Sequence, residues 1–569
     1  MGRRLYLAYP ALLAVVPILY RQVQNPGPTI ADTLAFSAML AAAIVLVQFV
    51  GYALLRAPLR RPGVRADLAA ALAAVAVVLF YRTPAISDAA HAYATEGSVQ
   101  WPAALLVAGL AGVLVALGWV AWRGGERARS ALGATSRFLA SAATLLVAWF
   151  GLRIAVAPAR VAWYVHRSPF IRDLTRPVPT PNAPAAGPPR DVYVLLLDAY
   201  PSADALREVY GIENTPVLDS LRALGFRVPA QLRSNFPITL LSVPTLLNFA
   251  DLRPLTEEMP RGYHDYGVAG YLFTHDRAAR FLKARGYQTV FFPSVWFAPT
   301  RHNREADVEF PGTPGFDPWR AINRSLLVEG FTRETLLRPL LRFVPTRQAM
   351  VTNEVVRTFR GVAALAARPA GGPPVYAFAH LLMPHGDFNA DSTCRPHPRG
   401  TTIYSDGPPD DPAVRAAAAG YVACANRQVL ATVHAILARP GARPIIILQG
   451  DHGTTARGLL GTHPDSITPE QVRERFTPFG AYYLPDGGAA ALPDTLSIVN
   501  VLRTVFSYYY GADLPPLPNA MYYVDVGKSY HATPIDTLRL RPVRGAAPES
   551  VARESAERIA RPASVSRNK

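Results

Sequence analysis

The stretch Arg443-Pro-Ile-Ile-Ile-Leu-Gln-Gly-Asp451-His452-Gly453 decides the fold of this chain. Four apolar residues between its proline and its first glycine predict a strand buried on both faces, as strands inside a parallel sheet are. An aspartate and a histidine follow at the carboxyl end, where open α/β sheets collect their reactive groups. Such a pair suits a divalent metal such as zinc. The alternative is a solvated turn that contains the two side chains by chance.

Other apolar runs in the C-terminal part of the chain also predict strands. The first, Asp191-Val-Tyr-Val-Leu-Leu-Leu-Asp198, again has an acid at its carboxyl end. Further strands are expected over Tyr287–Phe292, Val375–Ala379 and Phe479–Leu484, with helical patterns over Pro412–Leu437 and Asp494–Tyr508. Strands that alternate with helices predict an α/β sandwich around a mostly parallel central sheet.

The N-terminal part is apolar and predicts a transmembrane domain of five helices over residues 1–158. Its five apolar segments are Leu5–Tyr20, Leu34–Leu55, Leu68–Tyr81, Pro102–Trp122 and Phe138–Leu152. The second and fourth match the roughly 20 residues needed to span a bilayer. For the three shorter segments, buried helices of a soluble protein are the alternative.

The loop charges orient these segments. With the N-terminus inside, ten arginines lie in the inner segments and two in the outer loops. The ten are Arg3, Arg4, Arg56, Arg60, Arg61, Arg65, Arg123, Arg127, Arg129 and Arg137, and the two are Arg21 and Arg82. Positive loops stay in the cytoplasm, so five spans place everything after Pro158 outside it. We therefore expect a multi-pass protein of the cytoplasmic (inner) membrane with an extracytoplasmic C-terminal domain.

Composition sets the remaining boundaries. A proline-rich linker is predicted over residues 159–190, a globular domain over 191–536, and a basic, disordered tail over 537–569. The net charge of +17 is assigned to membrane anchoring and this tail, because no nucleic-acid-binding motif is present. In an oxidising compartment the two cysteines, Cys394 and Cys424, are expected to form a disulfide.

A pair of hydroxyls lies between the first two predicted strands, in Ser234-Asn-Phe-Pro-Ile-Thr239-Leu-Leu-Ser242-Val-Pro244-Thr. Proline is tolerated in the first turn of a helix, so a helix is expected to begin at about residues 240–243. Thr239 and Ser242 then lie at a helix N-terminus, which favours anions such as phosphate. Simple N-capping by a hydroxyl is the alternative.

The order of these motifs resembles the alkaline phosphatase superfamily. The resemblance rests on Asp198, Thr239-x-x-Ser-Val-Pro, Pro384-His385-Gly386, Asp451-His452-Gly453 and His463, in that order. It is strongest to the membrane-anchored, sulfatase-like branch that includes lipid A phosphoethanolamine transferases and lipoteichoic acid synthases. Those families also carry five N-terminal spans before an extracytoplasmic catalytic domain.

The resemblance implies a role for each matching residue. Thr239 would be the nucleophile and a metal ligand, and Asp198 the first acidic ligand, which is often Glu in those enzymes. Asp451 and His452 would complete a site for a divalent metal, zinc or manganese. His385 and His463 would bind substrate phosphate or a second zinc, and could protonate a leaving alcohol.

Two other polar residues near these motifs need no catalytic role. His380 is assigned to the end of its strand. Asn235 could line a phosphate pocket, but turn formation before Pro237 explains it equally well.

The chain departs from its relatives in two ways. Sulfatases need Cys/Ser-x-Pro-x-Arg, whereas Leu246 stands where the arginine belongs after Ser242, and the Arg399 that follows Cys394 comes one place late. The cysteine-rich pattern of the phosphoethanolamine transferases is also missing, so donor and acceptor do not carry over.

The resemblance implies an enzyme that moves a phospho-head group from a phospholipid donor to a glycan or lipid acceptor through a phosphothreonine. A sulfatase or phosphodiesterase that uses water, or a catalytically inactive sulfatase-like sensor, are the alternatives.

Overall fold

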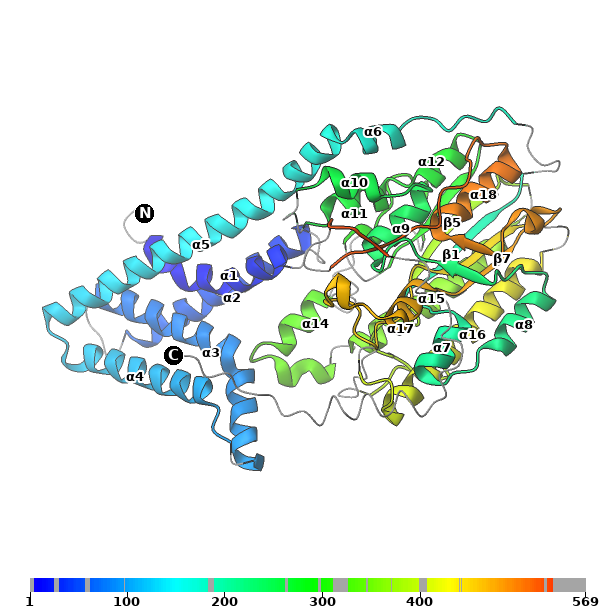
Figure 1. Cartoon of the computed structure of the whole chain (residues 1–569). Coiled ribbons are helices and arrows are strands. Elements are labelled where there is room, and N and C mark those ends of the chain that lie inside the picture. Colours follow the sequence, from blue (N-terminus) through cyan, green and yellow to red (C-terminus); the bar gives the residue numbers. More distant parts are fainter. Residues whose placement is uncertain are drawn as a thin grey trace.

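The computed structural model describes residues 5–24, 30–56, 62–96, 98–182, 189–260, 263, 265–294, 298–310, 326–343, 346–369, 371–398, 407–439, 441, 443–525 and 530–535. An elongated helical part lies on one side of the molecule and an α/β part on the other (Figure 1). The predicted tail falls outside the described residues. The domain boundaries at 158, 190 and 536 remain a prediction.

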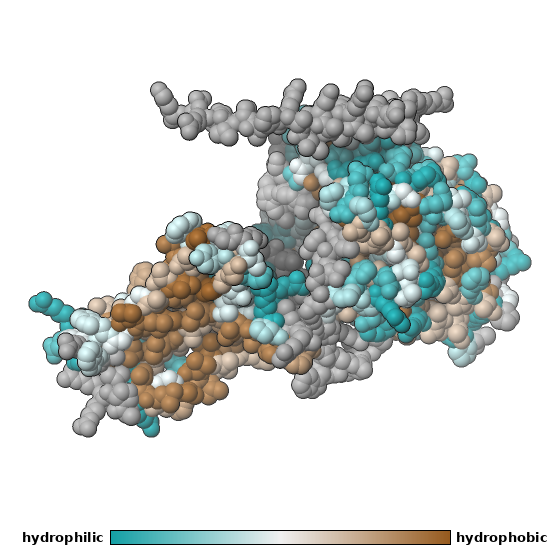
Figure 2. Space-filling view, turned by 90° about the horizontal axis from the view of Figure 1, so that it is seen from below, coloured by the Kyte–Doolittle hydropathy of each residue, from teal (hydrophilic) through white to brown (hydrophobic). Residues whose placement is uncertain are grey.

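The described residues of the N-terminal part form five α-helices: α1 (Tyr9–Gln24), α2 (Ile30–Leu54), α3 (Pro62–Glu96), α4 (Trp101–Arg123) and α5 (Glu126–Arg167). Four of them, α2 to α5, are long and apolar enough to cross a membrane by length and composition, while α1 is a shorter apolar helix. Their surface is largely hydrophobic (Figure 2), and side chains such as Leu46, Phe49 and Val115 are exposed. An exposed apolar surface of this size is expected of helices that face lipid.

The last of these helices continues into the α/β part. α5 runs through Pro158 to Arg167 and is followed by α6 (Pro169–Leu174). It packs against α11 (Gly267–Thr274), where a Cβ on Gly267 would lie 2.3 Å from a methyl of Val161. Helix therefore occupies the beginning of the segment predicted as a proline-rich linker.

The α/β part is built on a six-stranded sheet in the order β4-β3-β5-β1-β6-β7. Its strands are β1 (Val192–Leu197), β3 (Gln288–Phe292), β4 (Val308–Glu309), β5 (Val375–Leu381), β6 (Ile445–Gly450) and β7 (Gly480–Tyr483). Only β7 is antiparallel to its neighbour. The predicted α/β class with a mostly parallel central sheet is confirmed.

Helices cover both faces of this sheet, so the domain has three layers (Figure 1). In β1, Tyr193, Leu195 and Leu197 point into one core and the residues between them into the other, as the two-residue period of a strand requires. The first core is closed by α7 (Ala203–Tyr210), α8 (Thr215–Ala223), α15 (Arg347–Ala366) and α16 (Pro412–Leu437). The second is closed by α9 (Thr239–Asn248), α12 (Arg277–Lys283) and α18 (Ile498–Tyr510).

Smaller elements complete the domain: α10 (Arg253–Glu258), α14 (Leu326–Arg333), α17 (Pro469–Phe476), β2 (Gln231–Arg233), β8 (Thr495–Ser497), β9 (Met521–Tyr523) and β10 (Thr533–Ile535). The predicted helix from Asp494 begins later, at Ile498, because residues 495–497 pair with β2 instead. Cys394 and Cys424 are joined, as expected, which fastens the loop after β5 to α16.

Register places two acids side by side. Leu197, the last residue of β1, is level with Gly450 at the end of β6 and with Leu381 at the end of β5. The next residues along β1 and β6 are Asp198 and Asp451. Because parallel strands end at the same edge, these two carboxylates emerge together there.

Candidate active site

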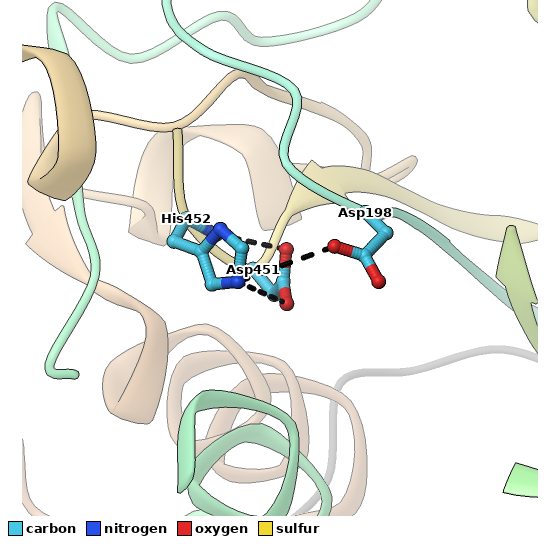
Figure 3. A group of neighbouring side chains, drawn as sticks. All are labelled: Asp198, Asp451 and His452. Atoms are coloured by element: carbon cyan, nitrogen blue, oxygen red, sulfur yellow. Dashed lines mark hydrogen bonds and ion pairs between the residues drawn. The ribbon is translucent and has the colours of Figure 1, made fainter. Parts of the chain in front are cut away.

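Three buried side chains converge at this edge of the sheet (Figure 3). Asp198 follows β1, and Asp451 and His452 follow β6. Each offers one ligand atom, and these atoms all lie within 4.8 Å of one another. The sequence predicted all three as metal ligands, and the fold brings them into one group.

The two carboxylates need a cation to be satisfied. Oδ1 of Asp451 accepts hydrogen bonds from the backbone N–H groups of Ala199 (3.0 Å) and His452 (2.9 Å). Oδ2 of Asp451 and Oδ1 of Asp198 are buried and accept no hydrogen bond from the described residues. Leaving such atoms unsatisfied in the interior is costly. A divalent metal between them would satisfy both, so the residues fit the metal that the sequence implies.

Electrostatics agree with this interpretation. Burial, and then the charge of Asp198, raise the pKa of Asp451 to about 7. Burial also acts to raise the pKa of Asp198, but His385 and His380 together outweigh it and hold that pKa below its ordinary value. Two adjacent carboxylates cannot both stay ionised at little cost unless a cation lies between them.

His452 is arranged as a metal ligand. Its Nδ1 lies 3.0 Å from the carbonyl of Gly453, so Nδ1–H donates there and Nε2 keeps a lone pair. Burial and the neighbouring charge of Arg475 hold the pKa of His452 well below its usual value. The ring is therefore neutral, which is the form that binds metals, and its Nε2 lies 3.2 Å from Oδ2 of Asp451.

The two candidate hydroxyls point in different directions. Thr239 is the first residue of α9, and its Oγ1 lies 3.0 Å from Nε2 of His452. Ser242 instead donates to the backbone carbonyl of Asp451 at 2.6 Å, as does Ser234. The helix begins one residue before the predicted range, and Pro244 lies inside it, beyond the first turn. Thr239 is thus the hydroxyl that faces the candidate metal ligands.

Of the two other predicted histidines, the structure brings one to the site. His385 lies half-buried in the loop after β5, and its charge acts on both Asp198 and His452. His463 is exposed and caps the 3-10 helix Pro464–Ser466, with its ring beside Asp465. The predicted role of His463 in binding substrate phosphate or a second zinc stays a prediction.

His380 is a site residue that the sequence analysis missed. Its Nε2 lies 3.0 Å from Oδ2 of Asp198, and both side chains are fully buried. The assignment of His380 to a strand end is confirmed, since β5 ends at Leu381, and its contact with Asp198 is a further feature that the sequence did not predict. The missing information was the strand order, because the sequence alone does not place β5 next to β1.

Arg475 was also missed, and no motif marks it. This buried guanidinium donates to the carbonyls of Pro237 and Gly453, each at 2.6 Å. Its Nη2 lies 3.3 Å from Nε2 of His452. Arg475 thus connects the loop that precedes Thr239 to the loop that carries His452.

Asn235 and Gly453 have structural explanations. Asn235 accepts from the N–H of Val499 (3.0 Å) and donates to the carbonyl of Ala520 (2.8 Å), so its amide is used within the fold. A Cβ on Gly453 would lie 1.8 Å from the carbonyl oxygen of Glu474, so only glycine fits after the Asp-His pair.

Fold and site together define an α/β-sandwich protein with apolar N-terminal helices and a buried candidate metal centre. No protein-family model and no curated protein matches the chain.

Among solved structures, the C-terminal periplasmic domain of EcEptC from Escherichia coli matches at 15% identity and a TM-score of 0.39, covering 64% of this chain and 97% of that one. The integral membrane lipooligosaccharide phosphoethanolamine transferase A from Neisseria meningitidis matches at 13% identity and a TM-score of 0.39, covering 90% and 97%. A 2-O GAG sulfatase matches at 15% identity and a TM-score of 0.35, covering 63% and 76%.

One of these structures is a phosphoethanolamine transferase, a class of enzyme that the motif order resembles, and another is a sulfatase.

Proposed function

We propose that the chain is a membrane-anchored, metal-dependent phosphotransferase of the alkaline phosphatase superfamily that moves a phospho-head group from a phospholipid to an extracytoplasmic glycan or lipid. One observation carries the proposal. The hydroxyl of Thr239 lies against Nε2 of His452, in a group with two buried carboxylate oxygens that have no hydrogen-bond donor among the described residues. A nucleophile beside an oxygen- and nitrogen-rich cation site is the arrangement that phosphoryl transfer to a hydroxyl needs.

Asp198, Asp451, His452 and the Thr239 hydroxyl would hold the metal. Two carboxylates, one imidazole and a hydroxyl suit zinc or manganese. A divalent ion there supplies two things: a lowered pKa for the Thr239 hydroxyl and positive charge for the phosphate oxygens.

The side chains then divide the reaction between them. Thr239 Oγ1 attacks the phosphorus, and the proton of this hydroxyl passes to solvent. The bond between the phosphorus and the diacylglycerol oxygen breaks, and its electron pair stays on that oxygen. His385, half-buried at the margin of the site, gives the leaving oxygen a proton. An acceptor hydroxyl next attacks the phosphothreonine and returns a proton to His385. The Thr239 oxygen leaves the phosphorus and takes up a proton from solvent.

The membrane helices support the choice of a lipid donor. Four described helices have the length and composition of membrane spans, and α5 continues from them into the α/β domain. The catalytic domain is thereby held near a bilayer surface, where the phosphate groups of phospholipids are concentrated. The arginine bias supports an extracytoplasmic position for this domain.

A phospholipid with a fluorescent acyl chain tests the proposal. The full chain in nanodiscs, supplied with zinc or manganese, is incubated with fluorescent phosphatidylethanolamine or phosphatidylglycerol. Removal of the whole phospho-head group yields fluorescent diacylglycerol, and we expect a chelator or Thr239→Ala to abolish it. Fluorescent phosphatidic acid would mean that the wrong phosphorus–oxygen bond is cleaved. Hydrolysis of a sulfate ester with no diacylglycerol would favour the sulfatase alternative instead.

A further inference from the structure

The α/β domain carries an unusual apolar segment. Among its described residues, the large apolar side chains that are exposed are Leu336 (52%), Leu340 (45%) and Phe343 (71%). All three lie within eight consecutive residues, just after α14. The remaining exposed large apolar side chains of the described chain belong to residues 20–163, most of them on the helices of the N-terminal part.

This segment follows directly on a contact with those helices (Figure 1). The ring of Phe331, at the end of α14, packs edge-on against Phe36 of α2 at 4.6 Å and against Tyr81 of α3 at 6.0 Å. The N–H of Leu336 donates to the carbonyl of Phe80 at 2.6 Å. Residues 331–336 are thus attached to α2 and α3.

Ion pairs fix the same contact. Glu334 pairs with Arg21 at the end of α1, and Arg338 pairs with Asp88 of α3 at 2.6 Å. Arg21 and Phe36 lie at the ends of α1 and α2 that the arginine bias places outside the cytoplasm. Phe80, Tyr81 and Asp88 lie in the second half of α3, which leads towards the same side. The apolar segment therefore lies where these helices leave the membrane on its extracytoplasmic side.

The geometry of the segment suits a lipid surface. Leu340 and Phe343 lie in the 3-10 helix Arg338–Phe343. With three residues per turn, side chains three apart lie on the same face. Leu336, two residues before this helix, adds a third exposed apolar side chain. A short helix with an exposed apolar face suits the plane of a membrane interface.

We infer that Leu336, Leu340 and Phe343 form a docking surface for the lipid bilayer, inserted at the headgroup–acyl boundary of the outer leaflet. Continuity with the candidate spans α2 and α3 identifies lipid as the occupant. The surface gives the α/β domain a second membrane attachment besides α5. The inference does not depend on the reaction proposed above.

Site-directed labelling tests this inference. Both natural cysteines are in the disulfide, so a single introduced cysteine in the unreduced full chain can be labelled selectively. Phe343→Cys carries an environment-sensitive fluorophore, and the protein is placed in nanodiscs of phosphatidylethanolamine and phosphatidylglycerol that contain acyl-chain nitroxide lipids. We expect the nitroxides to quench the label, and Leu340→Cys to behave in the same way.

Two matched positions complete the design. Phe49→Cys, on the exposed face of α2, should be quenched as a membrane-embedded site. Ser220→Cys, exposed on α8, which lies at the end of the α/β domain away from the N-terminal helices (Figure 1), should stay bright. A bright label at 343 beside a quenched label at 49 would overturn the docking surface and leave the membrane spans intact. Bright labels at both positions would overturn the docking surface and the membrane insertion of α2 together. If the label at 343 is quenched by a second copy of the protein that carries a nitroxide, but not by the nitroxide lipids, the surface is a protein interface and lipid docking is refuted.

Discussion

The Oγ1 atom of Thr239 lies 3.0 Å from Nε2 of His452, whereas the hydroxyl of Ser242, one turn further along α9, donates to a backbone carbonyl. The two hydroxyls thus have different chemical surroundings although both lie near the start of one helix. A hydroxyl already used to hold the Asp451 loop is poorly placed to attack a substrate. One that faces the buried carboxylates and imidazole is well placed.

We predict that His380 supports metal binding through Asp198. Its Nε2 lies 3.0 Å from Oδ2 of Asp198 in a fully buried pair. Hydrogen-bonding partners of metal ligands typically contribute about 10- to 100-fold in metal affinity. His380→Leu should lower zinc affinity by about that factor, measured by competition with a chromophoric chelator. His380→Gln, which can still donate a hydrogen bond, should lose less. Equal affinity in wild type and His380→Leu would remove His380 from the site.

Much of the candidate site could be predicted from the sequence, because its candidate ligands directly follow apolar runs. Asp198 and Asp451 end two strands whose buried character is plain in β1 and β6. His380 could not be assigned, since its role depends on β5 lying beside β1, a long-range pairing that no local pattern encodes.

Arg475 and His463 also show that a local sequence pattern does not determine where a side chain lies in the fold. Arg475 lies in α17, a helix without a chemical motif, and reaches the site through tertiary packing alone. His463 matched a motif by its order in the chain, yet its loop holds it beside Asp465 on the surface. Order along the chain was enough to group the candidate ligands at strand ends, but it does not say where a loop residue such as His463 lies, because that position depends on packing.

The disulfide should contribute measurably to stability. Cys394 and Cys424 are 30 residues apart in the chain, and Cys424 is buried in α16. In the loop-entropy model, such a link stabilises by about 3 to 4 kcal/mol. Reduction should therefore lower the melting temperature of the full chain in detergent, with Cys394→Ser as the matched variant that no longer responds to reductant. Alkylation of both cysteines in unfolded, unreduced protein would contradict the pairing.

Asp276 should make stability depend on pH. This buried carboxylate accepts the N–H of Ala279 at the start of α12, and burial raises its pKa from 3.8 to about 7. The folded chain then keeps a proton that the unfolded chain releases above pH 3.8. The contribution of protonated Asp276 to the free energy of unfolding is therefore complete below pH 3.8 and is lost as the pH rises towards about 7.

Asp276→Asn tests this pH dependence. Asparagine still caps a helix but cannot ionise. As the pH rises from about 4 to about 8, the melting temperature of the variant should therefore increase relative to that of the wild type. Parallel pH profiles would contradict the expectation.

The orientation of the α/β domain follows from the arginine bias and is open to a direct test. A reporter fused after residue 187 should be active only as an extracytoplasmic reporter, and one fused after residue 63 only as a cytoplasmic reporter. Cytoplasmic activity at residue 187 would reverse the topology and remove the phospholipid donor on the outer leaflet.

The central claim, that Thr239 carries the transferred group, is tested most directly by intact-mass spectrometry of the full chain purified from its own membranes. We predict a covalent adduct with the mass of a phospho-head group, located on Thr239 by fragmentation. Thr239→Ala should remove the adduct and lower turnover by several orders of magnitude, while the fold and metal binding remain. Ser242→Ala, which loses one buried hydrogen bond worth about 1 kcal/mol, should keep both adduct and turnover. An adduct that survives in Thr239→Ala, or that is lost in Ser242→Ala, would contradict the account.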